Sequence, residues 1–218
     1  MPSENRRKRD RERRQNEIIN AAEKLFFSKG YDEIAMDDVA ADAGLAKGTL
    51  YTYFKSKESL CYAVALRGVK LLNTLFDEAV KMENTGVNKI YSTGVAYYEF
   101  SKKYPEYFKL FSYAESERFV CRDDENALEL TKVSQKNLNI MLESIRIGQE
   151  DGSIMPGLDP LMTAIFLMEC TKAMILIPGF HVTLCRNGQD REEVMRFTLE
   201  RLKRSIVNNP VDDSAAIR

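Results

Sequence analysis

The chain has 218 residues, with 32 basic and 33 acidic side chains, one histidine and four cysteines. The net charge of −1 gives no overall sign of a nucleic-acid-binding protein. No apolar run approaches the roughly 18 residues of a membrane span, and no apolar signal segment follows the basic N-terminus, so we expect a cytoplasmic protein without a membrane partner. The cysteines lack zinc spacing, which predicts reduced thiols, no metal and no cofactor.

Basic side chains gather at the N-terminus. The first 15 residues contain seven arginines or lysines and three acidic residues. We expect residues 1–14 to form an arm that is either disordered or an extension of the first helix. Such an arm could lie along phosphates or enter a minor groove, or it could be a solubilising tail.

Two helices are predicted before residue 45. The first covers about residues 13–29 and ends at Gly30, because apolar side chains recur at i, i+4, i+7 and i+8. These side chains are Ile18, Ala22, Leu25 and Phe26. The second covers residues 36–43 and has one apolar face, and we expect Gly44 to close it as a left-handed cap.

A short helix over residues 46–54 follows almost without a loop. Only Leu50 and Phe54 are placed to reach the core, so the polar residues face outward, as in a helix that enters the DNA major groove. On this basis we predict base contacts from Lys47 and Thr52 and a close backbone approach at Gly48. The alternative is that this polar face is only solvated.

Hydroxyl groups and a lysine predict contacts with phosphates, which fix the register of a protein on DNA. The hydroxyls are those of Thr49, Tyr51 and Tyr53. Ser56 is a natural N-cap of the next helix, so Lys57 falls in its first turn beside free N–H groups that favour an anion.

The stretch AGLAKGTLYTYFKSKESL resembles the signature of the TetR family of bacterial transcriptional regulators, and the match extends over about residues 18–60. The resemblance implies that Lys47, Thr49, Tyr51, Thr52 and Tyr53 contact DNA and that Lys57 contacts a phosphate. Ala35 and Met36 depart from the family, which usually has threonine or serine there. We therefore expect the first helix of the motif to lack its N-cap and one phosphate contact.

Further helices are expected over residues 56–82, 126–150, 160–177 and 190–207, with two more of about 17 and 12 residues separated at Pro105. A polar loop is expected at 120–126 and a disordered tail at 208–218.

Aromatic residues are frequent between 87 and 119, and they predict an apolar cavity for an apolar or aromatic effector. The candidate effector-binding residues are Tyr97, Phe100, Tyr107, Phe108, Phe111, Met141 and Glu169. Glu169 could meet a cationic ligand or simply pair with Lys172.

The predicted helix at 160–177 is apolar nearly all round and must be buried on more than one side. Pairing it and the last helix with the same helices of a second subunit would bury the excess, in a four-helix interface about a two-fold axis. The family resemblance implies the same arrangement. The predicted interface residues are Phe166, Leu167, Met174, Met195, Leu199, Leu202 and Ile206.

We therefore predict an all-α fold of about nine helices, with a helix-turn-helix DNA-binding domain at 15–60 and a larger effector-binding and dimerisation domain at 61–207. The predicted function is a homodimeric, ligand-responsive transcriptional regulator, with repression favoured, that binds double-stranded DNA at a palindromic operator. One alternative is a regulator of the same fold that responds to a protein partner or has no ligand. An all-α enzyme is less favoured, because His181, the sole histidine, provides neither a catalytic dyad nor a metal site.

Overall fold

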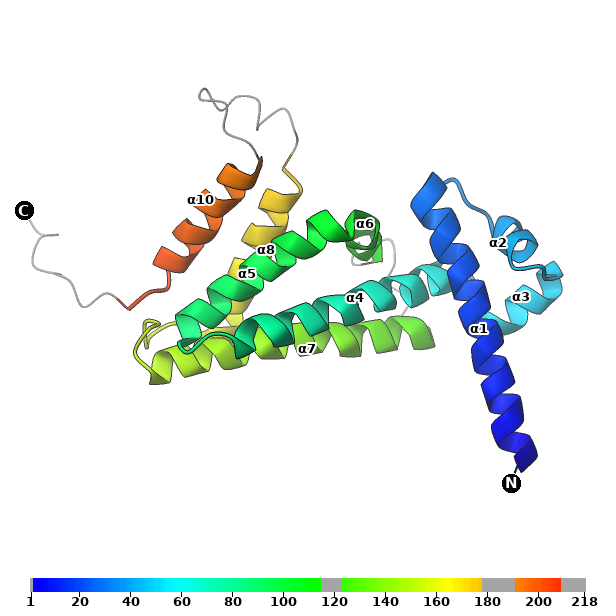
Figure 1. Cartoon of the computed structure of the whole chain (residues 1–218), viewed down its shortest axis with the longest axis horizontal. Coiled ribbons are helices and arrows are strands. Elements are labelled where there is room, and N and C mark those ends of the chain that lie inside the picture. The colour runs from blue at the N-terminus through cyan, green and yellow to red at the C-terminus, as the bar shows by residue number, and fades with distance from the viewer. Residues whose placement is uncertain (1, 115–122, 178–190, 209–218) are drawn as a thin grey trace, which may run out of the picture. The chain divides into compact units, whose positions relative to one another are not determined.

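The computed structural model describes residues 2–114, 123–177 and 191–208, and most residues of these segments are helical (Figure 1). Within them the chain forms nine helices: α1 (Pro2–Lys29), α2 (Met36–Asp42), α3 (Lys47–Tyr53), α4 (Lys57–Lys81), α5 (Gly86–Lys103), α6 (Pro105–Ala114), α7 (Glu125–Glu150), α8 (Pro160–Ile175) and α10 (Arg191–Arg204). The described segments hold one isolated β-bridge, between Ile154 and Val207, and no strand. The predicted all-α fold is confirmed.

Some expected features lie outside the described residues. These are most of the polar loop at 120–126, the segment that holds His181, and the tail after residue 208. The N-terminal arm does lie within them from Pro2 onward. There it continues α1 as a helix, which was one of the two expected conformations.

Local signals in the sequence set several helix ends. Gly44 has a φ of 64°, in the left-handed region where glycine carries no steric penalty, and it follows α2. Pro105 begins α6. Before α8, the Asp159 carboxylate accepts a hydrogen bond from the Met162 N–H at 2.8 Å, and Pro160 occupies the first turn. The boundaries predicted at these three points are confirmed.

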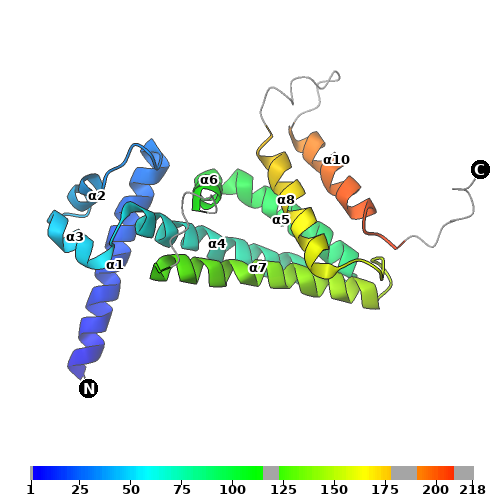
Figure 2. The same cartoon turned by 180° about the vertical axis from the view of Figure 1, so that it is seen from behind.

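The chain divides into two compact units. One comprises residues 1–71 and 104–134, and the other comprises residues 72–103 and 135–218. In the first unit, α2 lies beside the C-terminal half of α1, α3 borders the stretch of α1 from Arg7 to Arg14, and the N-terminal end of α1 projects beyond both (Figures 1 and 2). Its fully buried core includes Ile18, Val39, Leu50, Phe54, Leu60 and Val64.

The second unit is built around α5, α8 and α10, which pack on one another, with α8 and α10 side by side in both views (Figures 1 and 2). The loop after α7 is tied to the end of α10, because the Met155 N–H donates to the Ile206 carbonyl at 3.0 Å. Among the described helices, none combines the length and apolar character that crossing a membrane would require.

Candidate DNA-binding surface and effector cavity

Helix α2 begins without a side-chain cap. Ala35 occupies the N-cap position and its methyl group cannot accept a hydrogen bond, whereas the Asp38 carboxylate accepts one from the Ala35 N–H at 2.8 Å. Only half of a capping box is therefore present. The expected loss of the N-cap hydrogen bond is confirmed, and the accompanying loss of a phosphate contact stays a prediction.

Helix α3 turns its polar face to solvent. Leu50 and Phe54 have no exposed surface, whereas 42% of Tyr51 is exposed. Four further candidates are also exposed, namely Lys47, Gly48, Thr49 and Thr52. Tyr53 is half-buried. The Thr52 hydroxyl donates to the Thr49 carbonyl at 2.7 Å, so it would meet a base as an acceptor or through its methyl group. Exposure on this face agrees with the sequence, and contact with DNA stays a prediction.

Lys47 has a partner that the sequence did not reveal. Its ammonium lies 2.9 Å from the Asp37 carboxylate of α2, and about three-fifths of each side chain is exposed. The hydrogen bond that Lys47 donates to Asp37, together with the negative charge of that carboxylate, raises the pKa of Lys47. The cation that is predicted to read a base is therefore charged and held by an exposed carboxylate, which DNA would have to displace.

Lys57 is held by the loop between α1 and α2. Its ammonium donates to the carbonyl of Tyr31 at 2.9 Å and of Asp32 at 3.4 Å, and it lies 4.2 Å from the centre of the Tyr31 ring. Ser56 caps α4 as predicted, since its hydroxyl accepts from the Ser59 N–H at 3.2 Å. These bonds leave one ammonium proton of Lys57 for a phosphate, so this side chain joins two segments of the first unit as well as being a candidate contact.

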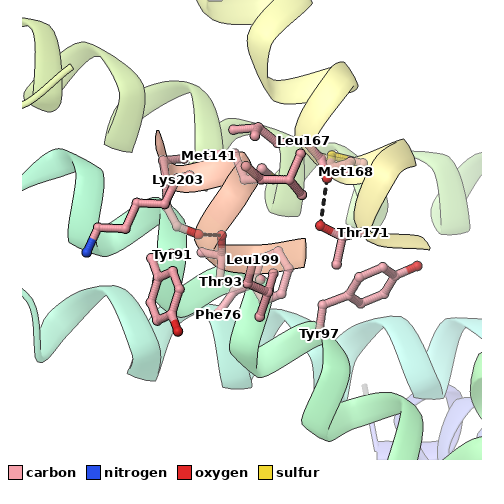
Figure 3. Close-up of a pocket in the computed structure, with 13 residues that line it drawn as sticks. Phe76, Tyr91, Thr93, Tyr97, Met141, Leu167, Met168, Thr171, Leu199 and Lys203 are labelled. Carbon is pink, nitrogen blue, oxygen red and sulfur yellow. Dashed lines mark hydrogen bonds between the residues drawn. The ribbon is translucent and has the colours of Figure 1, made fainter. Parts of the chain in front are cut away.

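An apolar cavity of about 30 Å³ lies within the second unit. It is lined by Phe76, Ile90, Tyr91, Thr93, Gly94, Tyr97, Met141, Leu167, Met168, Thr171, Leu199, Leu202 and Lys203 (Figure 3). The hydroxyls of Thr93 and Thr171 donate to the carbonyls of Ile90 and Leu167 in their own helices. Lys203 points away from the apolar centre, and its ammonium donates to the Asn88 side chain at 3.0 Å.

Leu199 of α10 closes this cavity against the backbone of α5. A Cβ placed on Gly94 would lie 2.7 Å from a methyl of Leu199, so a larger residue at position 94 would push that methyl aside. A space of this size holds about one water, whereas pockets for small molecules typically occupy roughly 300–1,000 Å³. An effector could enter only if α10 moved outward from α5.

The cavity brings together two of the seven candidate effector-binding residues, Tyr97 and Met141. Phe100 is buried in the second unit but does not line the cavity. Tyr107, Phe108 and Phe111 belong to the first unit. Glu169 is exposed on α8 rather than embedded among apolar neighbours.

Tyr107 has a structural role in the first unit. Its hydroxyl donates to the Glu23 carboxylate at 2.8 Å, and the same carboxylate oxygen accepts from Arg67 at 2.9 Å. Burial and then the bond to Glu23 raise the pKa of the Tyr107 hydroxyl. The side chain therefore links α6 to α1 and α4.

Comparisons with known proteins agree with this geometry. Residues 18–64 match the family model for bacterial regulatory proteins of the tetR family. The chain is 29% identical over 158 residues to the HTH-type transcriptional regulator YhgD of Bacillus subtilis, a match covering 72% of this chain and 80% of YhgD. An HTH-type regulator of Staphylococcus aureus (strain USA300) is 40% identical over 72 residues, covering 33% of this chain and 38% of that protein.

Residues 18–64 are therefore a domain of the TetR family of bacterial regulatory proteins. Solved structures show the same fold at low sequence identity. The ketosteroid transcriptional regulator KstR2 of Mycobacterium tuberculosis matches with a TM-score of 0.63 and 18% identity, over 90% of this chain and 96% of that one. The regulator FadR of Bacillus subtilis, in complex with stearoyl-CoA, matches with a TM-score of 0.63 and 19% identity, over 85% and 96%.

Four of the predicted dimerisation residues are buried within their own chain. Leu167, Met195, Leu199 and Ile206 are all at most 6% exposed. Met174 and Leu202 are half-buried, and only Phe166 is well exposed, at 48%. The four buried residues therefore pack α8 and α10 within the second unit, which corrects their assignment to an outward-facing surface.

The outward apolar surface of the same helices consists of Phe166, which the sequence predicted, and of four residues that it did not. We call this set the α8–α10 face: Leu161, Met162, Ile165, Phe166 and Phe197. Their exposed fractions run from 44% to 68%. A signal for Phe197 is that Glu193, Glu200 and Arg201 lie at i−4, i+3 and i+4 from it and so share its side of the helix, because charged residues mark the outer side.

Proposed function

We propose that this TetR-family regulator is a homodimeric repressor in the cytoplasm, which binds a palindromic operator and is released by a small, largely apolar effector. We assign operator binding to residues 15–60, and effector binding and dimerisation to residues 61–207. The observation that carries the proposal is the orientation of α3, whose polar side is exposed while Leu50 and Phe54 anchor its other side. Such an arrangement fits a helix that reads the major groove.

The α8–α10 face supports a dimer. Four of its five members lie on α8, which also has buried residues on its inner side, so the helix is apolar on both sides. A second copy of the chain would cover this surface about a two-fold axis. Two copies of α3 would then meet successive major grooves about 34–36 Å apart, or a multiple of that, which requires a palindromic operator.

The cavity under α10 supports an apolar effector. Most of its lining is hydrocarbon or aromatic, and Lys203 provides a cation at its edge. Among proteins of the same fold, FadR of Bacillus subtilis was solved with stearoyl-CoA, and KstR2 is described as a ketosteroid regulator. Because Leu199 and Leu202 form one wall, a ligand that pushes on α10 would also disturb the helix that contributes Phe197 to the α8–α10 face.

Release requires the effector to prefer one conformation of the dimer. A coupling of about 1–3 kcal/mol between effector and operator sites weakens operator binding roughly 5- to 150-fold. Helix α4 contributes residues to both units, so it is the element through which we expect this coupling to pass.

A second candidate is a TetR-family regulator that responds to a protein partner or to no ligand. The cavity volume of about 30 Å³ favours it, because an effector of ordinary size does not fit without rearrangement. The two candidates are separated by adding stearoyl-CoA, or a 3-ketosteroid, to the operator complex. Weakening by at least five-fold supports the effector model, and unchanged binding with both compounds supports the second candidate.

The main test is selection of bound duplexes from a random DNA pool, repeated over a salt series. We expect a palindromic consensus and an affinity that falls steeply with salt, because phosphate contacts release counterions. A consensus without two-fold symmetry would contradict the dimer, and an absence of any enriched sequence would contradict operator recognition. Sedimentation of the free protein measures the dimer independently.

A further inference from the structure

The first turns of α1 form a basic projection beyond the core. Buried side chains begin at Ile18, whereas all residues from Asn5 to Arg13 are exposed. Arg7, Arg11 and Arg14 recur at i, i+4 and i+7 and therefore share one face of the helix. The projection is a continuation of α1, so its side chains are held in fixed positions relative to the rest of the first unit.

This arginine face borders α3. A groove on the surface is lined by residues of α1 on one side and by Thr52 and Tyr53 of α3 on the other. The guanidinium of Arg11 lies 5.7 Å from the centre of the Tyr53 ring, within the range of a cation–π contact. The basic projection and the proposed major-groove helix therefore open onto the same stretch of surface.

Acidic neighbours neutralise only part of this charge. Arg14 pairs with Glu17 at 2.7 Å, and Arg13 approaches Asp10, which also lines the groove, at 3.9 Å. Neither Arg7 nor Arg11 forms an ion pair with any carboxylate whose side chain the structure describes. Among the arginines that line the groove, these two guanidinium groups are accordingly the ones that remain to bind an external anion.

We propose that Arg7 and Arg11, presented by the helical extension of α1, bind backbone phosphates beside the groove that α3 reads. The inference rests on the proposed operator binding and adds a second contact element to it. The two residues are four apart and so about 6 Å along the helix, close to two base-pair steps of about 3.4 Å. Guanidinium groups suit this partner, because their planar donors match phosphate oxygens.

The helical state decides which part of DNA this element can reach. An α-helix with its side chains is about 10–12 Å across, and a minor groove is about 6 Å wide. The projection therefore cannot thread into the minor groove as an extended arm would. Its contribution should be to phosphates and so independent of base sequence.

The first experiment compares two double variants that remove the same charge. R7A/R11A alters the face beside α3, and K8A/R9A alters residues that do not line the groove. Binding to the selected operator is measured over a salt series. Loss of two phosphate contacts per protomer, four per dimer, should reduce the slope of log affinity against log salt by about 4 in R7A/R11A. We expect K8A/R9A to change this slope by less than the value of one phosphate contact.

Equal slopes in the two double variants would overturn the proposal in favour of unspecific charge attraction. Slopes equal to that of the parent in both would identify the projection as a solubilising segment, or as a site for some other anion. If the parent protein itself bound no selected sequence, the proposed operator binding would fail and this inference with it. The parent measurement therefore separates the two failures.

The second experiment keeps every arginine and breaks the helix. Glu12→Pro removes a backbone donor and disfavours the helical conformation of Arg11, whereas Glu12→Ala makes the same charge change and favours helix. We expect the salt slope of E12P to fall by at least half as much as the slope of R7A/R11A. E12A should bind no more weakly than the parent. Equal binding by E12P and E12A would show that a flexible arm is sufficient, which contradicts the rigid element. Circular dichroism checks that both variants stay folded.

Discussion

Helices α3 and α8 differ in how clearly their sequences mark the buried side. In α3 the apolar positions Leu50 and Phe54 stand among polar residues, and both are fully buried. In α8 apolar residues occupy nearly every position, and Leu167 is 4% exposed while its neighbour Phe166 is 48% exposed. Contrast between polar and apolar residues identifies a buried face, and a helix without contrast conceals it.

Helix α8 has two apolar sides, and we assign a different partner to each. One side of α8 is covered by α5 and α10 within the chain, and the other side is the α8–α10 face that we assign to a second copy. Sequence periodicity records that both sides are apolar, but not which partner covers which side. Of the four predicted dimerisation residues that are buried in the chain, Leu167 follows from this ambiguity. Met195 and Leu199 lie on the single apolar stripe of α10, and Ile206 lies just after that helix; there the sequence marked the buried side but not the partner that covers it.

The largest expected effect tests the α3 side of the comparison. Phe54→Ala should lower the free energy of unfolding by about 3–5 kcal/mol, because it opens a cavity in the core of the first unit. Tyr51→Ala, three residues earlier on the exposed side, should change it by no more than about 0.5 kcal/mol while weakening operator binding. Urea unfolding measures the free energy of unfolding, and DNA titration measures the affinity for the operator. A comparable loss of stability in both variants would contradict the assigned faces.

The α8 side can be tested with two adjacent residues. Leu167→Ala should lower the unfolding free energy of the protomer by about 2–5 kcal/mol. Phe166→Ser should instead raise the dimer dissociation constant by roughly 100-fold, because the change occurs twice in a symmetric interface and about 1.4 kcal/mol per copy is a factor of ten. Denaturation and sedimentation equilibrium separate the two effects. A stable dimer in F166S would place the interface elsewhere.

Much of the helix layout could be predicted because its signals are local. Gly44, Pro105 and the Asp159-Pro160 pair mark helix ends through their own backbone preferences. The cavity lining could not be predicted, because it depends on which helices meet. Tyr97 and Tyr107 are both aromatic residues in the same stretch, yet one lines the cavity and the other bonds to Glu23.

Long polar side chains were equally hard to place from sequence. Lys57 was assigned to a phosphate because of its position in the first turn of α4, and the structure adds bonds to carbonyls about 25 residues earlier in the chain. Asp37, the partner of Lys47, lies ten residues before it on another helix. Side chains with several rotatable bonds choose partners after the backbone has folded, so spacing alone does not identify them.

Two lysines within the motif should therefore behave differently. Lys47→Ala is expected to relax preference at one base position in each half-site, at a cost of about 1–3 kcal/mol for the preferred base. Lys57→Ala should weaken binding about equally on all sequences, and it should also lower the unfolding free energy by about 1 kcal/mol, because its carbonyl partners lose a charged donor. Selection from a random pool distinguishes loss of preference from uniform loss. If both variants bound the selected site as tightly as the parent, both roles would be wrong.

The smallest expected effect concerns the carboxylate that holds Lys47. Asp37→Asn should tighten operator binding by about two- to five-fold at low salt, because an exposed ion pair is weak and its removal leaves Lys47 for DNA. The gain should shrink as salt screens the charges. A double-mutant cycle identifies the cause. If Asp37 acts by holding Lys47, then D37N has no effect in a K47A background. If it acts by repelling the phosphates directly, the gain persists there, and the ion pair between α2 and α3 has no part in recognition.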